Sequence, residues 1–169
     1  MLMHKLPHVI TLNQENQLMK IFILYGTETG NSELFAEDVQ AALKDQHEVT
    51  LVDMQNATLD MLSPENDLTI IIISTYGEGE YPTNAQAFVK IIQDKQPDLH
   101  GCRIAFFGLG DTFYTGHYNV CVKTLQKLLT GLGAEQIGPC GLHDASSGQM
   151  IDELMQPWLD AIFSDLKKQ

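Results

Sequence analysis

The chain has 169 residues, enough for one domain with a substantial core. Hydrophobic residues make up 44% and charged residues 19%, which is typical of a soluble globular domain. The 22 acidic and 10 basic residues give a formal charge of −12, which disfavours nucleic acid and anionic membranes as partners and would suit a basic protein, although acidity can also serve solubility alone.

Residues 1–19 form an N-terminal extension of unknown role, because they show no clear periodicity and no apolar core typical of a signal peptide. Strand-like runs follow at residues 20–25, 48–52, 68–74 and 102–108, with a weaker one at 135–139. The third run, LTIIIIS, is continuously apolar, as expected of a strand covered on both faces, and it is too short to cross a membrane.

Helical patterns separate these runs. Their apolar stripes lie within residues 34–43, 85–92, 122–132 and 151–166. Pro157 falls inside the last pattern, so that helix either begins near this residue or kinks there. The segment 53–65 is too short and too interrupted for more than a brief helix.

This alternation of strands and helices predicts an α/β fold with an open, doubly wound parallel sheet. Helical crossovers between parallel strands are right-handed, which places helices on both faces of the sheet. The sequence contains no internal repeat and no linker, so residues 20–169 are expected to form one domain. In such sheets ligands bind at the carboxyl ends of the strands.

The three cysteines, Cys102, Cys121 and Cys140, form no CxxC motif and no zinc-ligand spacing with a nearby histidine. A sparse, odd set of cysteines is typical of buried thiols in a reducing compartment. The sequence therefore predicts a cytoplasmic protein without a metal site.

Three polar, glycine-rich segments follow the first, third and fourth predicted strands. They are GTETGNS (26–32), STYGEGEYPTN (74–84) and GLGDTFYTGHYN (108–119). Turn chemistry alone would explain one such segment, because glycine, threonine and asparagine favour turns. Three of them at the same edge of a parallel sheet indicate a ligand site.

The first segment has the composition of an anion site without a cation. Thr27, Thr29 and Ser32 surround Gly30 at the start of a predicted helix, where hydroxyls and free backbone N–H groups can bind a phosphate. Gly30 can adopt a positive φ, and Asn31 or Ser32 can cap the helix. Such a cradle suits a terminal phosphate that is held rather than cleaved.

Two other phosphate-binding motifs fit less well. A nucleotide-hydrolysing loop needs GxxxxGK[ST], and the lysine is missing. A dinucleotide fingerprint needs GxGxxG after the first strand, whereas the near match GLGDTF follows the fourth strand and has Phe113 in place of the third glycine.

The other two segments each carry a tyrosine between or beside glycines. Tyr76 and Tyr114 could stack on the two faces of a planar ring, although either could also be an ordinary half-buried loop residue. A phosphate site next to a ring site indicates a mononucleotide, and a flavin is the ring best served by stacking on both faces.

The motifs TETGNSE, STYGEGE and FGLGDTFY resemble, in this order, the phosphate loop and the two flavin loops of the flavodoxin family. The similarity extends over residues 20 to about 168, and the chain resembles short MioC-type flavodoxins and the FMN domains of diflavin reductases, such as cytochrome P450 reductase and the sulfite reductase flavoprotein. It implies a flavodoxin-like, five-stranded parallel sheet of order 2-1-3-4-5, tightly bound FMN and one-electron transfer.

The resemblance also implies which residues contact FMN, and it implies no catalytic residue. The phosphate loop comprises Thr27, Glu28, Thr29, Gly30, Asn31 and Ser32. The first ring loop comprises Ser74, Thr75, Tyr76, Gly77, Glu78 and Gly79. The second ring loop comprises Leu109, Gly110, Asp111, Phe113 and Tyr114, followed by His117, Tyr118 and Asn119. Asp144 resembles an acidic residue near the ring edge in the reductases.

The expected function is that of a monomeric FMN carrier, which docks its acidic face on a basic reductase and then on a basic acceptor. Three alternatives remain at this point. The chain could be a flavin-dependent quinone or nitro reductase, an FMN domain excised from a larger diflavin reductase, or a scaffold that has lost its flavin.

Overall fold

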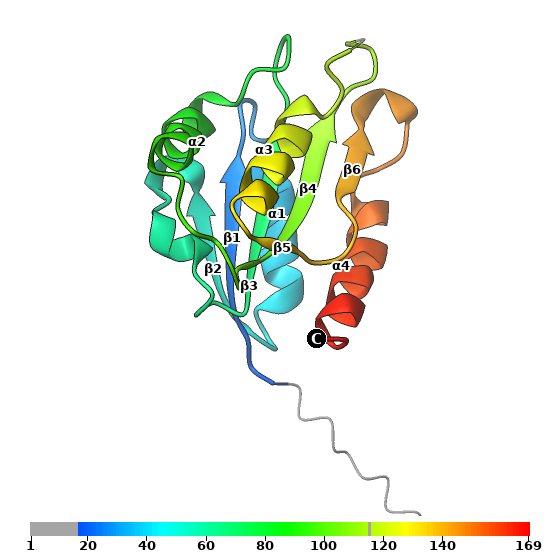
Figure 1. Ribbon diagram of the computed structural model, residues 1–169. Helices are drawn as coiled ribbons and strands as arrows, with labels where there is room; N and C mark the ends of the chain where they lie inside the picture. The colour runs from blue at the N-terminus through cyan, green and yellow to red at the C-terminus, as the bar shows by residue number, and fades with distance from the viewer. Residues whose placement is uncertain (1–16, 115) are drawn as a thin grey trace, which may run out of the picture.

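The computed structural model describes residues 17–114 and 116–169 (Figure 1). The strands are β1 (Lys20–Gly26), β2 (Glu48–Asp53), β3 (Leu68–Ser74), β4 (Arg103–Gly110), β5 (Glu135–Gln136) and β6 (Gly141–Asp144). The helices are α1 (Asn31–Leu43), α2 (Thr83–Lys95), α3 (Val120–Gly131) and α4 (Asp152–Leu166), with short 3₁₀ helices η1 (Met54–Asn56), η2 (Leu59–Leu62) and η3 (Ala145–Ser147). The predicted extension at 1–19 lies outside the described residues except for its last three.

The strands form one parallel sheet in the order β2-β1-β3-β4-β5, which confirms the predicted fold class and topology. The order reverses between β1 and β3, because the chain first adds β2 on one side of β1 and then returns to add β3 on the other. Strand β3 is buried at every position before Ser74, as its continuous apolar run predicted.

The fifth strand is split in two, which the sequence did not predict. Both β5 and β6 pair with β4. From Ile104 to Phe107 the register advances three residues along β4, whereas the partner chain advances five, from Gln136 to Gly141. The two extra residues are accommodated around Gly138, which has a φ of 66°, and Pro139, which has no N–H to donate to the ladder.

Helices cover both faces of the sheet (Figure 1). Ile71 and Ile73 of β3 pack in the cluster that contains the buried side chains of α2 and α3. Ile70 and Ile72 point to the other face and pack with those of α1 and α4. The strand period of two residues therefore divides a wholly apolar strand between two cores.

Two details of the helices follow from local sequence. The segment 53–65 forms only the 3₁₀ helices η1 and η2, as expected. Helix α4 begins at Asp152, so the alternative that it starts near Pro157 is wrong. None of the helices in the described part of the chain is long and apolar enough to span a bilayer.

Candidate functional site

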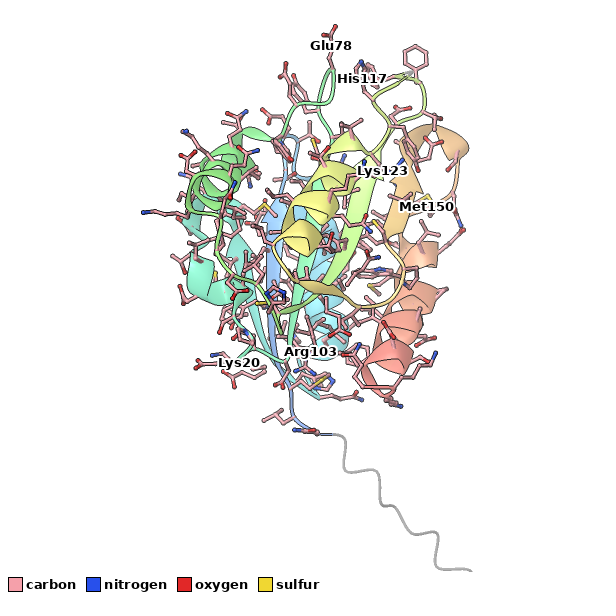
Figure 2. The ribbon with its side chains drawn as sticks, viewed as in Figure 1. Lys20, Glu78, Arg103, His117, Lys123 and Met150 are labelled. Carbon is pink, nitrogen blue, oxygen red and sulfur yellow. The ribbon has the colours of Figure 1, made fainter. Side chains whose placement is uncertain are left out.

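The three glycine-rich loops lie at one edge of the sheet, beyond the ends of β1, β3 and β4 (Figure 1). Hydrogen bonds join them directly. The Thr75 N–H donates to the Leu109 carbonyl at 3.0 Å, which links the two ring loops. Figure 2 shows Glu78 and His117 at this edge and Lys20 and Arg103 at the opposite one. The structure therefore brings together the three segments that the sequence assigned to a single ligand.

The phosphate loop enters α1 through a left-handed glycine. Gly30 is the N-cap residue, with a φ of 96°, and its carbonyl accepts the first helical hydrogen bond from Leu34 at 3.0 Å. The amides between these two residues precede that bond and so have no intrahelical acceptor. The expectation that Asn31 or Ser32 caps the helix is wrong, because the cap is a residue without a side chain.

Ser32 is the most informative residue of this loop. It is fully buried in the first turn of α1, and its hydroxyl has no hydrogen-bond partner among the described residues. A buried hydroxyl without a partner is costly, so such groups usually serve a ligand or a water molecule. A phosphate at the N-terminus of α1 would supply an acceptor, and the residues present therefore fit an FMN phosphate.

A side chain outside the expected set holds the phosphate loop in place. The Asn84 Oδ1 accepts from the Thr27 N–H at 2.8 Å, and its Nδ2 donates to the Asp53 carboxylate at 3.0 Å. Thr27 in turn accepts from the Gly30 N–H through its Oγ1, at 2.8 Å. Asn84 is the last residue of the motif STYGEGEYPTN. No sequence pattern indicated that it contacts Thr27, 57 residues earlier in the chain.

Glu28 also joins the first two loops. Its carboxylate accepts from the Thr83 N–H at 2.8 Å and from the Thr83 hydroxyl. Thr83 is the first residue of α2, so Glu28 provides a negative charge at the positive end of that helix. Because the Glu28 carboxylate is bonded to Thr83, only the backbone of Glu28 is available to a ligand.

The first ring loop is a tight turn closed by Tyr76 and Glu80. Each donates its N–H to the carbonyl of the other, at 3.1 and 2.9 Å. Gly77 and Gly79 lie within the turn and have φ values of 53° and 95°, which glycine adopts without strain. The Tyr76 side chain remains 49% exposed, so its ring is available to a ligand.

The second ring loop is held by its own acidic residue. The Asp111 carboxylate accepts from the Phe113 N–H at 2.9 Å, and its carbonyl accepts from the Tyr114 N–H at 3.2 Å. The rings of Phe113 and Tyr114 meet edge to face with centroids 5.6 Å apart. Both side chains are more than half exposed, so this loop presents aromatic surface beside that of Tyr76.

Asp144, at the end of β6, supports the second ring loop. Its carboxylate accepts from the Thr112 N–H at 3.0 Å and from the Thr112 hydroxyl at 2.7 Å. It also accepts from the N–H and hydroxyl of Ser146. The hydrogen bonds from Thr112, followed by those from Ser146, hold the pKa of Asp144 well below its usual range. Thr112 was absent from the expected set, although it lies within a quoted motif.

The residues that follow this loop have different environments. Asn119 is fully buried with a φ of 52°, and it donates through Nδ2 to the His143 carbonyl at 3.5 Å. Its Oδ1 has no partner among the described residues. The Tyr118 ring lies under the Lys123 ammonium, 5.2 Å from its centroid. The side chains of His117 and Val120 both approach Gly79 in the first ring loop, each 3.5 Å from the position that a Cβ would take there.

A separate hollow of about 830 Å³ lies at the opposite edge of the sheet. Among its lining residues, Arg103 lies 3.6 Å from Asp67, and the His47 Nδ1 accepts from the Met19 N–H at 3.2 Å, so these polar side chains have protein partners. We therefore assign the candidate site to the loop edge, where polar groups converge. The described residues include no cluster of side chains suited to a metal ion.

The strand order and the loops gathered at one edge define an α/β protein with an open, doubly wound sheet, whose candidate ligand site is at the carboxyl ends of the strands. Residues 23–158 match the family model described as Flavodoxin. The chain therefore belongs to the flavodoxin family, a membership that the sequence motifs predicted.

Known relatives include both large reductases and small flavodoxins. The chain is 35% identical over 164 residues to NADPH-dependent diflavin oxidoreductase 1 of Aspergillus fumigatus, with 90% of this chain and 25% of that protein covered. It is 38% identical over 132 residues to the NADPH–cytochrome P450 reductase of Homo sapiens, with 73% and 19% covered. The structure of a point mutant of flavodoxin from Pseudomonas aeruginosa superimposes with a TM-score of 0.77 and 30% identity, with 88% of this chain and 99% of that chain covered.

The chain thus spans a quarter or less of the length of these two curated relatives. It spans nearly the whole length of the Pseudomonas flavodoxin. Flavodoxin, flavoprotein and electron transport describe the family to which it belongs.

Proposed function

We propose that the chain binds FMN and transfers single electrons between a reductase and an acceptor protein. The observation that carries this proposal is the N-terminus of α1, where the Ser32 hydroxyl is buried beside the first helical amides and has no partner among the described residues. Two exposed tyrosines on the neighbouring loops, Tyr76 and Tyr114, offer stacking surface for the ring.

FMN, when bound, supplies the ring that accepts and releases electrons, and the chain's own residues bind and orient it. In the proposed arrangement the phosphate lies against residues 27–32, and the ring lies between residues 74–79 and residues 109–114. Asp144 acts on the second ring loop through Thr112. We propose that residues 117–119 contribute to FMN binding indirectly, through the packing of α3 and of the second ring loop.

The charge at this edge supports a basic protein partner. The loops at residues 26–32, 74–84 and 108–114 contain Glu28, Glu78, Glu80 and Asp111 but no lysine or arginine. A partner with a basic surface would be attracted to such an edge, and the association would weaken as salt rises. We propose a monomer in the cytoplasm, where the three free cysteines would stay reduced.

A second candidate is the FMN domain of a larger diflavin reductase, which the low coverage of the curated relatives favours. The flavodoxin from Pseudomonas aeruginosa, by contrast, is matched over 99% of its chain. Both candidates share FMN binding and one-electron transfer. A flavin-dependent quinone or nitro reductase differs from both, because the purified chain would then oxidise NADPH at a steady rate.

Thr29→Val tests the phosphate site. The change removes one hydroxyl donor from the cradle while keeping the side-chain shape. The loss of a hydrogen bond to a charged group costs about 1.5–3 kcal/mol, so the Kd for FMN should rise at least about tenfold. The Kd for riboflavin, which has no phosphate, should change little.

Thr130→Val, at the far end of α3, is the matched control and should leave both affinities unchanged. Titration of the flavin-free chain, followed by flavin fluorescence, measures each Kd. If Thr29→Val weakened FMN and riboflavin equally, the proposed phosphate site would be wrong. If the parent bound neither flavin, the proposed function would be wrong.

A further inference from the structure

The glycine-rich sequence of the first ring loop does not by itself determine the backbone conformation of the loop. Its turn contains two glycines with positive φ, Gly77 and Gly79, and an added Cβ at Gly77 would meet nothing within 4 Å. Figure 2 shows Glu78 at the tip of the loop, away from the sheet. A glycine-rich turn of this kind has many accessible backbone conformations. A contact from outside the loop is therefore needed to select one of them.

Cys121, in the first turn of α3, makes such contacts. Its Sγ donates to the Glu80 carbonyl at 3.1 Å, with the Gly79 carbonyl at 3.6 Å. Its N–H donates to the Thr75 Oγ1 at 3.0 Å. One buried residue thus reaches both the beginning and the end of the loop, across more than 40 residues of sequence.

The hydrogen bond from the Cys121 thiol and the hydrogen bond that closes the turn share one acceptor atom. The Glu80 carbonyl oxygen accepts both the Tyr76 N–H, at 3.1 Å, and the Cys121 Sγ–H. Burial raises the pKa of Cys121, which keeps the thiol protonated and able to donate. If the Glu80 peptide turned away, the thiol and the Tyr76 N–H would both lose their present partner.

We propose that Cys121 is a positioning residue for the flavin, because its thiol, bonded to the Glu80 carbonyl directly after the first ring loop, holds that loop in the conformation that presents Tyr76 to the ring. This inference rests on the proposed function, since the loop must contact FMN for its conformation to matter. The simpler reading is that the thiol only fills space in the core, as buried cysteines commonly do.

Cys102 separates these two readings, because it is a matched cysteine remote from the site. It is 1% exposed, as is Cys121, and its Sγ donates to the Leu62 carbonyl at 2.9 Å. Cys102→Ala and Cys121→Ala therefore remove the same atom from equally buried positions. If the thiol only filled space, both changes would lower stability and neither would act specifically on the ring loop.

The first measurement is amide hydrogen exchange in the flavin-free chain, at the N–H groups of Tyr76, Gly79 and Glu80. Cys121→Ala should speed exchange at these amides by about fivefold or more, as expected when a hydrogen bond of ordinary strength is lost. Cys102→Ala should leave them unchanged. Cys121→Ser, whose hydroxyl can donate to the same carbonyl, should restore most of the protection.

The second measurement is flavin affinity. The thiol acts on the ring loop and not on the phosphate loop, so Cys121→Ala should weaken FMN and riboflavin by the same factor, about threefold or more if the loop must be ordered on binding. This pattern differs from that of Thr29→Val, which should weaken FMN alone.

Parental exchange rates at the three amides in Cys121→Ala would overturn the proposal, and so would equal acceleration by Cys102→Ala. Because exchange is measured without flavin, it is independent of the proposed function. A chain that showed the exchange pattern but bound no flavin would refute the proposed function and the role toward the flavin, while leaving the contact between α3 and the loop intact.

Discussion

Gly108→Ala should destabilise the protein by a specific steric conflict. Gly108 lies in β4 opposite the first turn of α3, and an added Cβ would lie 2.4 Å from the Val122 Cγ1 and 2.6 Å from the Asn119 Oδ1. Contacts below 3.0 Å do not occur between real atoms of this kind, so the helix or the strand must move. The backbone φ of Gly108 is not positive, so the cost comes from packing and not from backbone strain.

The magnitude follows from the two neighbours. Overpacking of a core position costs about 1–3 kcal/mol. Displacement of the Asn119 side chain would also weaken its hydrogen bond to the His143 carbonyl, for about a further 0.5–1.5 kcal/mol. For a chain of this length each kcal/mol lowers Tm by about 2–4 °C. We therefore expect a free energy of unfolding lower by about 1.5–4.5 kcal/mol and a clearly lower Tm.

Gly131→Ala is the matched control, because it adds the same methyl group at the end of α3, where nothing lies within 4 Å. It should be neutral or should stabilise by about 0.5–1 kcal/mol, since alanine favours helix more than glycine does. Urea unfolding of both variants, followed by circular dichroism, gives the comparison. A Gly108→Ala variant within about 0.5 kcal/mol of the parent, the range of ordinary surface changes, would refute the proposed close packing of α3 on β4.

Three further predictions concern single side chains. Burial, and then the hydrogen bond to Glu33, raise the pKa of Tyr25 to about 12. The stabilisation that this shift provides is therefore complete below pH about 10 and is lost as pH rises through about 12. Tyr25→Phe should make the free energy of unfolding less dependent on pH in that interval, and an unchanged slope would contradict this. The Tyr81 hydroxyl is buried without a partner among the described residues, so Tyr81→Phe should raise the free energy of unfolding by up to about 1 kcal/mol in urea titrations, whereas a loss of stability would reveal a partner. Asp144→Asn should speed hydrogen exchange at the Thr112 amide, because a charged acceptor is lost, and in the parent the low pKa of Asp144 should preserve that protection from pH 7 down to about 4.

The fold and the meeting of the three glycine-rich loops at one edge could be predicted from the sequence because they depend on local patterns. Strand-like runs alternating with helical stripes require parallel strands, and parallel strands place the segments that follow them at one edge of the sheet. The three glycine-rich motifs therefore indicated a common site before any contact was known. Their hydroxyl and aromatic residues led us to expect a phosphate and a planar ring in the ligand, which stays a prediction.

Errors appeared where backbone geometry decided the outcome. The cap of α1 was expected to be Asn31 or Ser32, but the left-handed Gly30 is the N-cap, and Ser32 lies buried in the first turn. The fifth strand was expected to be continuous from 135 to 139, but Pro139 interrupts its ladder, and pairing with β4 resumes at Gly141. Residue types alone did not determine where a helix begins or where pairing resumes.

Only the tertiary structure revealed the residues that support the loops. Asn84 contacts Thr27 across 57 positions, and Cys121 contacts Thr75 across 46. Sequence periodicity describes which face of an element is buried, over a few turns or strand residues. Which carbonyl or hydroxyl a buried side chain then reaches depends on how distant elements pack, and at Gly108 that packing has no room for a single methyl group.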